Sequence, residues 1–130
     1  MHIITDLDTG GAEIMLYKLL ASLRNEEINS SVISLMGRGK ITEQIEALGV
    51  KVETLDLGQG ERPSWQTIKK LRQFMRAFNP DIVQGWMYHG NIAATVAVFL
   101  FDPMCRKVKL FWNVRQTLYD INSEKIQTRW

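Results

Sequence analysis

Apolar and polar positions alternate along the chain in blocks that predict strands and helices in turn. Short apolar or β-branched runs predict strands at residues 2–5, 31–36, 50–55, 81–85 and 108–112. Apolar residues at helical spacing predict intervening helices at residues 11–23, 41–48, 65–78 and 91–101, with a last helix from Asn122 onward. Ser64 can cap the third helix, Gly49 can end the second, and Asn79-Pro80 ends the third.

Strand–helix alternation of this kind favours right-handed crossovers and a sheet covered on both sides. We therefore expect an α/β fold: a Rossmann-like, doubly wound, mainly parallel five-stranded sheet with helices on both faces. No repeat or linker divides residues 1–130, so a single domain is predicted. The first strand begins almost at residue 1 and the last helix has no room to finish, so we expect a fragment of a longer chain.

Composition narrows the possible classes of protein only slightly. The 130 residues are 45% hydrophobic and 23% charged, which is enough apolar material for a core without disulfides or metal. The formal net charge of +2 neither requires nor excludes a nucleic-acid or membrane partner, and we expect no nucleic acid. Cys105 has no second cysteine to pair with, which favours a reducing compartment, and we expect a cytoplasmic protein.

One predicted helix has a pattern with two interpretations. Lys69, Lys70, Arg72 and Arg76 surround its apolar stripe. Such a helix could touch the anionic inner face of a membrane, or it could simply pack on the sheet as an ordinary amphipathic helix. The apolar run at residues 92–101 is well short of the roughly 20 residues that span a bilayer, so it is interpreted as a buried helix.

The glycines gather after the predicted strands, at the edge where open α/β sheets bind ligands. Eight of the nine glycines lie there, and Gly49 is the exception. The turn at Gly10 and Gly11 opens a helix, where free backbone N–H groups suit a phosphate or a sugar hydroxyl. It is neither a P-loop nor a dinucleotide fingerprint. A preference of turns for glycine is the plainer alternative.

Two further segments at the same edge carry candidate binding groups. Tyr88 and His89 follow the fourth strand, where an aromatic ring can pack on a sugar and an imidazole can bind a hydroxyl or stabilise charge. A histidine that caps the next helix is the equal alternative. Arg115 follows the fifth strand and could bind a phosphate or carboxylate, or form a surface ion pair. The two histidines and one cysteine have no metal-ligand spacing, so neither metal nor cofactor is expected.

Taken in order, these segments resemble a known family. The turn Gly10-Gly11-Ala12-Glu13 after an apolar strand, the junction Leu48-Gly49-Val50-Lys51-Val52, and Pro80-Asp81-Ile82-Val83-Gln84 followed by Tyr88-His89-Gly90-Asn91 occur at matching intervals. They resemble the N-terminal, acceptor-side domain of the family-four retaining glycosyltransferases of GT-B fold.

The resemblance implies a function and a distribution of roles. Such enzymes transfer a sugar from a nucleotide-sugar donor, often a UDP- or GDP-sugar, to an acceptor such as a glycan or a lipid-linked glycan, with retention and without a catalytic metal. It implies that Gly10 and Gly11 lie near the donor phosphates or the acceptor, that Tyr88 and Asn91 belong to the same binding surface, and that His89 is catalytic, near the transferred sugar. The resemblance supports a role for Arg115 less well, because many relatives have a histidine in that segment. The donor domain is missing, so the chain alone should be inactive.

Two other functions stay open from the residues alone. The first is a stand-alone module that binds a nucleotide or phosphorylated ligand without catalysis. The second is a flavodoxin-like regulatory domain, for which Asp6 and Asp8 supply part of an acidic cluster. That second alternative ranks last, because the usual lysine after the fifth strand is absent.

Overall fold

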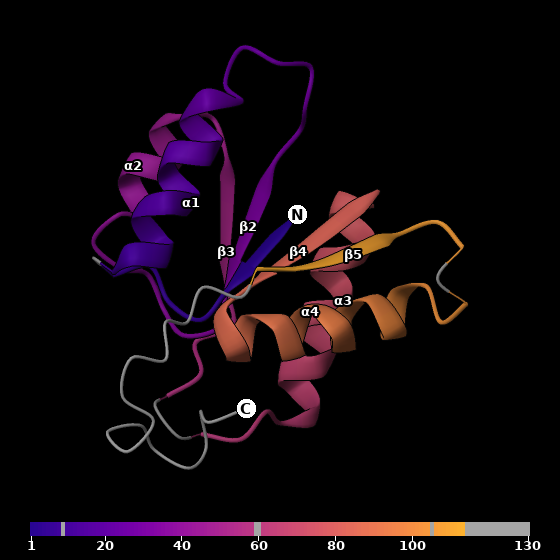
Figure 1. Ribbon diagram of the computed structural model, residues 1–130. Coiled ribbons are helices and arrows are strands. Elements are labelled where there is room, and N and C mark those ends of the chain that lie inside the picture. Colours follow the sequence, from indigo (N-terminus) through magenta and orange to yellow (C-terminus); the bar gives the residue numbers. More distant parts are fainter. Residues whose placement is uncertain (9, 59–60, 105, 114–130) are drawn as a thin grey trace, which may run out of the picture.

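The computed structural model describes residues 1–8, 10–58, 61–104 and 106–113, and these form one five-stranded parallel sheet with helices on both faces (Figure 1). The strands are β1 (His2–Ile4), β2 (Ser31–Ser34), β3 (Lys51–Thr54), β4 (Ile82–Trp86) and β5 (Lys109–Asn113). Their order is β3-β2-β1-β4-β5, and every neighbouring pair is parallel. The predicted fold class is confirmed, and the part of the sheet described is entirely parallel.

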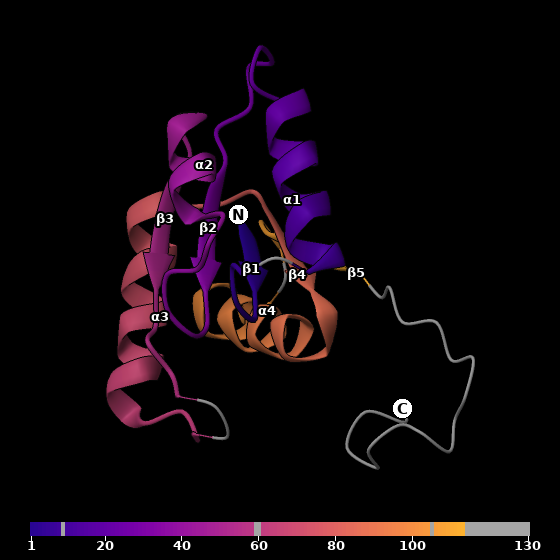
Figure 2. The same cartoon turned by 90° about the vertical axis from the view of Figure 1, so that its left-hand side faces the viewer.

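Four helices follow the first four strands in turn, and they divide between the two faces. They are α1 (Gly11–Ser22), α2 (Thr42–Ala47), α3 (Trp65–Phe78) and α4 (Met87–Phe101). Figures 1 and 2 show α1 and α2 on one side of β1–β3, with α3 and α4 on the other. The part of the chain after Asn113, which includes the helix predicted from Asn122, lies outside the described residues.

Two apolar cores hold these layers together, one on each face, because successive side chains along a strand point to opposite sides. Ile4, Val32 and Trp86 face α1 and α2, where they meet Leu16, Leu20 and Ile45. Ile3, Ile33 and Val83 face α3 and α4, where they meet Leu71, Met75, Ala94, Ala97 and Val98. Burial of β1 on both faces explains why Ile3 and Ile4 are both apolar although they point to opposite sides.

The predicted helix ends are confirmed where the structure describes them. The Ser64 hydroxyl caps α3 by accepting a hydrogen bond from the backbone N–H of Thr67, at 3.3 Å. Gly49 follows α2 with a φ of 86°, a conformation that glycine adopts without strain. Asn79 ends α3 with a φ of 55°, and Pro80 follows it.

The start of α4 differs from the sequence prediction. We expected a loop through Gly85–Asn91 and a helix from Asn91, but α4 begins at Met87, whose φ of 65° turns the chain sharply out of β4. The helix then continues through Gly90, because the absence of a side chain lets its first turns lie directly on β1. A Cβ at Gly90 would stand only 2.7 Å from the carbonyl oxygen of Ile3. The glycine favours close packing here rather than a loop.

Candidate functional site

The connections that leave β1 and β4 part at the carboxyl edge of the sheet. These strands are neighbours, with Ile4 opposite Trp86. The chain leaving β1 enters α1 on one face, whereas the chain leaving β4 enters α4 on the other. Such a topological switch point is where open α/β sheets bind ligands. The geometry therefore brings the turn at Gly10 and the first turn of α4 to one edge.

Gly10 forms the start of α1 in a tight turn. Its extended backbone, with φ −114° and ψ 177°, caps the helix without a side-chain hydrogen bond. Its N–H donates to the carbonyl of Asp8 at 3.1 Å, and the Asp6 carboxylate accepts from the N–H of Asp8 at 3.1 Å. A side chain at Gly10 would collide with the Glu13 carboxyl group, whereas Gly11 has open space around it. Gly11 can therefore approach a ligand closely.

A pair of carboxyl groups lies beside this turn, and the sequence prediction missed it. The pKa of Glu13 is raised, chiefly by partial burial and further by hydrogen bonding to Asp6 and by the negative charge of Asp6. The backbone N–H groups of Glu13 and Gly10 act in the opposite direction. The positive end of α1 thus already faces acidic groups. This arrangement suits a neutral hydroxyl better than a phosphate.

The side chains of the first turns of α4 differ in their exposure. His89 is exposed at the carboxyl edge, and its ring contacts that of Tyr88 edge-on at 5.3 Å between centroids. Asn91 is only 4% exposed. Its Oδ1 has no hydrogen-bond partner among the residues that the structure describes. A buried polar atom without a partner costs about 1–3 kcal/mol, so this amide carries a stability cost that a functional role would explain.

Beneath these residues, His2 and Trp86 fix the end of β4. The indole Nε1–H of Trp86 donates to Nδ1 of His2 at 3.1 Å, and both side chains are buried. Burial, together with the positive charge of the nearby amino terminus, lowers the pKa of His2 to about 4. His2 is therefore neutral near pH 7 and serves as a structural acceptor. Nothing in the sequence pattern indicated this partnership across 84 positions.

Three basic residues, Arg38, Lys40 and Arg62, follow β2 and β3 and have different surroundings. Arg38 forms an ion pair with Glu46 at 2.5 Å, which raises the pKa of its guanidinium. Lys40 and Arg62 are exposed. Arg115 lies outside the described residues, so its position relative to Gly10 and His89 stays a prediction. Among residues 1–8, 10–58, 61–104 and 106–113, no group of three acidic, histidine or cysteine side chains could hold a metal ion.

The clustering of glycines at this edge has a packing cause in several places. A Cβ at Gly39 would collide with the backbone of Leu7, and one at Gly85 would stand 2.6 Å from the Cα of Asn91. These glycines therefore let backbone segments meet. Their position at the carboxyl edge does not by itself indicate a ligand. Gly11 differs, because the space around it is open and a ligand could approach its backbone.

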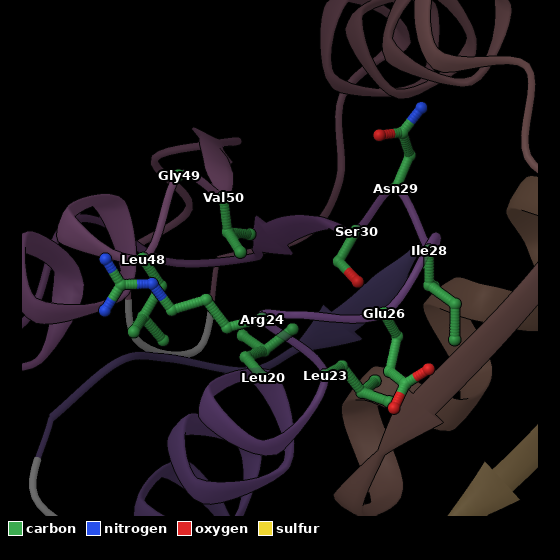
Figure 3. A pocket seen from close by; sticks show the side chains of 10 residues that line it. All are labelled: Leu20, Leu23, Arg24, Glu26, Ile28, Asn29, Ser30, Leu48, Gly49 and Val50. Atoms are coloured by element: carbon green, nitrogen blue, oxygen red, sulfur yellow. The ribbon is translucent and has the colours of Figure 1, made fainter.

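A hollow of about 240 Å³ lies at the opposite, amino edge of the sheet. Figure 3 shows its walls, formed where α1 and α2 end and where β2 and β3 begin, with Arg24, Ser30 and Gly49 among its lining residues. It lies at the other end of the strands from Gly10 and His89. The hollow and the candidate site are thus separate features.

Comparison with known proteins identifies one family. The family model described as Glycosyltransferase Family 4 matches residues 9–111, which is most of the chain. A search of the curated proteins and a search of the solved structures found no match to the chain. The matched segment includes the turn at Gly10 and Gly11 and the whole first part of α4.

Proposed function

Because the chain belongs to glycosyltransferase family 4, we propose that it forms the acceptor-side half of a sugar-transfer site, at the switch point between β1 and β4. The donor is a nucleotide-sugar, of the UDP- or GDP-sugar class, and the acceptor is a glycan or a lipid-linked glycan. Transfer proceeds with retention at the anomeric carbon. A second domain of the same enzyme supplies the donor-binding half, so this part alone is inactive.

The observation that carries the proposal is the meeting of two connections at one edge. The parallel pairing of β1 with β4 brings Gly11 and His89 to the same end of the sheet. A ligand between them would meet open backbone on one side and an exposed imidazole on the other. The family membership favours a transferase over a stand-alone binding module, which shares the fold but needs no second half.

The chemistry of the site assigns different roles to its groups. The Asp6–Glu13 pair disfavours an anion at the start of α1, so we assign this turn to acceptor hydroxyls rather than donor phosphates. His89 binds or stabilises charge at the transferred sugar, and Tyr88 packs beside it. Asn91 keeps a buried amide beneath the first turns of α4, and its unpaired Oδ1 is the group that we assign to an acceptor hydroxyl.

The test measures sugar transfer by the intact enzyme in three variants. His89→Ala should reduce kcat/KM by about a hundred- to a thousandfold, the range expected when one group that stabilises developing charge is lost. Asn91→Leu, which replaces the amide by an apolar side chain of similar size, should reduce transfer without loss of stability. Asn29→Ala, an exposed change at the amino edge, should leave transfer unchanged.

Circular dichroism and thermal unfolding establish that each variant is folded. Transfer at the wild-type rate in folded His89→Ala would remove that residue from the site. Equal losses in the Asn29 control and the two site variants would show a general effect on folding and would overturn the assignment. Inversion at the anomeric carbon in the product would refute the retaining stereochemistry.

A further inference from the structure

A stripe of basic residues follows the outer side of α3, away from the apolar core. Trp65, Lys69, Arg72 and Arg76 recur at intervals of three or four residues, so they share one flank of the helix. All four are exposed, and Trp65 is 79% exposed despite its size. A different side of α3 is buried through Leu71 and Met75, which lie about 100° around the helix axis from Arg72 and Arg76. The stripe is therefore a surface feature and takes no part in the core.

The stripe has no acidic residue to balance it. The sequence of α3 contains neither aspartate nor glutamate. Its Lys70 approaches Asp56 at 3.7 Å, but Lys70 lies on another flank. Within the described parts of the chain, Lys69, Arg72 and Arg76 form no ion pair. Three uncompensated cations on one helix flank create a local positive field although the net charge of the chain is only +2.

The neighbouring helix α4 exposes apolar side chains instead of charged ones. α4 contacts α3 on the same face of the sheet, and none of its 15 residues is aspartate, glutamate, lysine or arginine. Ile92, Val96 and Phe99 lie on the side of α4 opposite its buried residues, and Phe99 is 65% exposed. A helix that is apolar on all sides is normally buried. The outer side of α4 therefore lacks the apolar surroundings that its sequence fits.

We propose that this α3–α4 face docks on an anionic lipid bilayer. The cations of α3 contact lipid phosphates, while Phe99 and its aliphatic neighbours on α4 enter the interface between headgroups and acyl chains. Trp65, at the start of α3, is a residue type that favours this interface. Within the described residues, no helix is long and apolar enough to cross a membrane. The proposed contact lies in the plane of the interface.

The apolar stripe distinguishes a bilayer from a nucleic acid. Nucleic acids would attract Lys69, Arg72 and Arg76 equally well, but their phosphate backbone gives exposed aliphatic side chains nothing to pack against. A bilayer satisfies both stripes at once. The inference is independent of the proposed transfer reaction, since docking concerns α3 and α4 surfaces and requires neither His89 nor a donor.

The test is flotation of the purified protein with vesicles of phosphatidylcholine alone or of phosphatidylcholine with phosphatidylglycerol. We expect binding to the anionic vesicles, weakened by salt. The triple variant Lys69→Gln/Arg72→Gln/Arg76→Gln should lower the partition coefficient on the order of a hundredfold, at roughly fivefold for each basic side chain. Phe99→Ser should weaken binding in a way that salt does not reproduce.

A matched control removes the same charge elsewhere. Lys18→Gln/Arg24→Gln/Lys40→Gln changes three exposed cations of segments on the α1–α2 side, and it should leave vesicle binding intact. Equal losses in both triple variants would show attraction by net charge alone and would overturn the proposal. Absence of binding by the wild type would overturn it too, as would tight binding to single-stranded RNA that the α3 variant alone abolishes while vesicles are ignored.

Discussion

Gly90→Ala should destabilise the protein, because the first turns of α4 lie directly on the backbone of β1. The added Cβ would stand 2.7 Å from the carbonyl oxygen of Ile3, inside the 3.0 Å limit below which real Cβ contacts essentially never occur. The position of the Cβ is fixed by the backbone of α4 and its partner is a backbone atom of β1, so neither can rotate away. α4 must shift outward, and its contacts with β1 must loosen.

The magnitude follows from two opposing effects. Alanine stabilises a helix relative to glycine by about 0.5–1 kcal/mol. Overpacking of a tight contact costs typically about 1–3 kcal/mol. The net loss in the free energy of unfolding should therefore lie between about 0 and 2.5 kcal/mol, with a central value of about 1 kcal/mol. Urea unfolding followed by circular dichroism measures this loss as a lower midpoint with an unchanged slope.

Gly11→Ala is the matched control, because Gly11 occupies the first turn of α1 and has nothing within 4 Å of an added Cβ. The same chemical change there should be neutral or should stabilise the protein by up to about 1 kcal/mol. If Gly90→Ala were as stable as Gly11→Ala, α4 would have room above β1. The packing argument for the early start of α4 would then be refuted.

Two further changes test the surroundings of the site. The pKa of His2 is lowered from 6.5 to about 4 in the folded protein. Between pH 6.5 and pH 4 the unfolded chain therefore binds more protons than the folded chain. The free energy of unfolding should fall by roughly 3 kcal/mol as the pH drops through this range. His2→Gln, which keeps an acceptor for Trp86 but does not titrate, should flatten that part of a pH series of urea unfolding curves; an unchanged slope would exclude His2 as its source. Ser64→Ala should cost about 0.5–2 kcal/mol by removing the cap of α3, measured by thermal unfolding, and Gln66→Ala, an exposed neighbour, should change little. Equal stability of the two variants would show that the cap contributes nothing.

Much of this fold follows from the sequence because its strands are short apolar blocks and its helices are periodic. The order of strands and helices, the Ser64 cap and the left-handed Gly49 all depend on local chemistry that one segment carries by itself. The parallel sheet could be predicted from the alternation of strands and helices along the chain, because a helix that connects two parallel strands makes a right-handed crossover.

The site could be predicted only as far as the edge on which it lies. The extension of α4 through Gly90 depends on how closely β1 passes beneath it, and a glycine in a sequence does not reveal such a distance. The acidic pair of Asp6 and Glu13 likewise forms only when the turn at Gly10 folds back. The buried contact of His2 with Trp86 joins residues far apart in the chain, so no local pattern could predict it.

The close packing of α4 on β1 has a mechanical consequence. Gly90 packs directly on Ile3 of β1, and Gly85 of β4 packs directly on Asn91, because neither glycine has a side chain. The turn of α4 that carries His89 must therefore move together with β1. If the proposed function holds, differences in acceptor shape must be accommodated by other loops at the carboxyl edge. The turn around His89 should then keep its geometry in relatives that share this close packing.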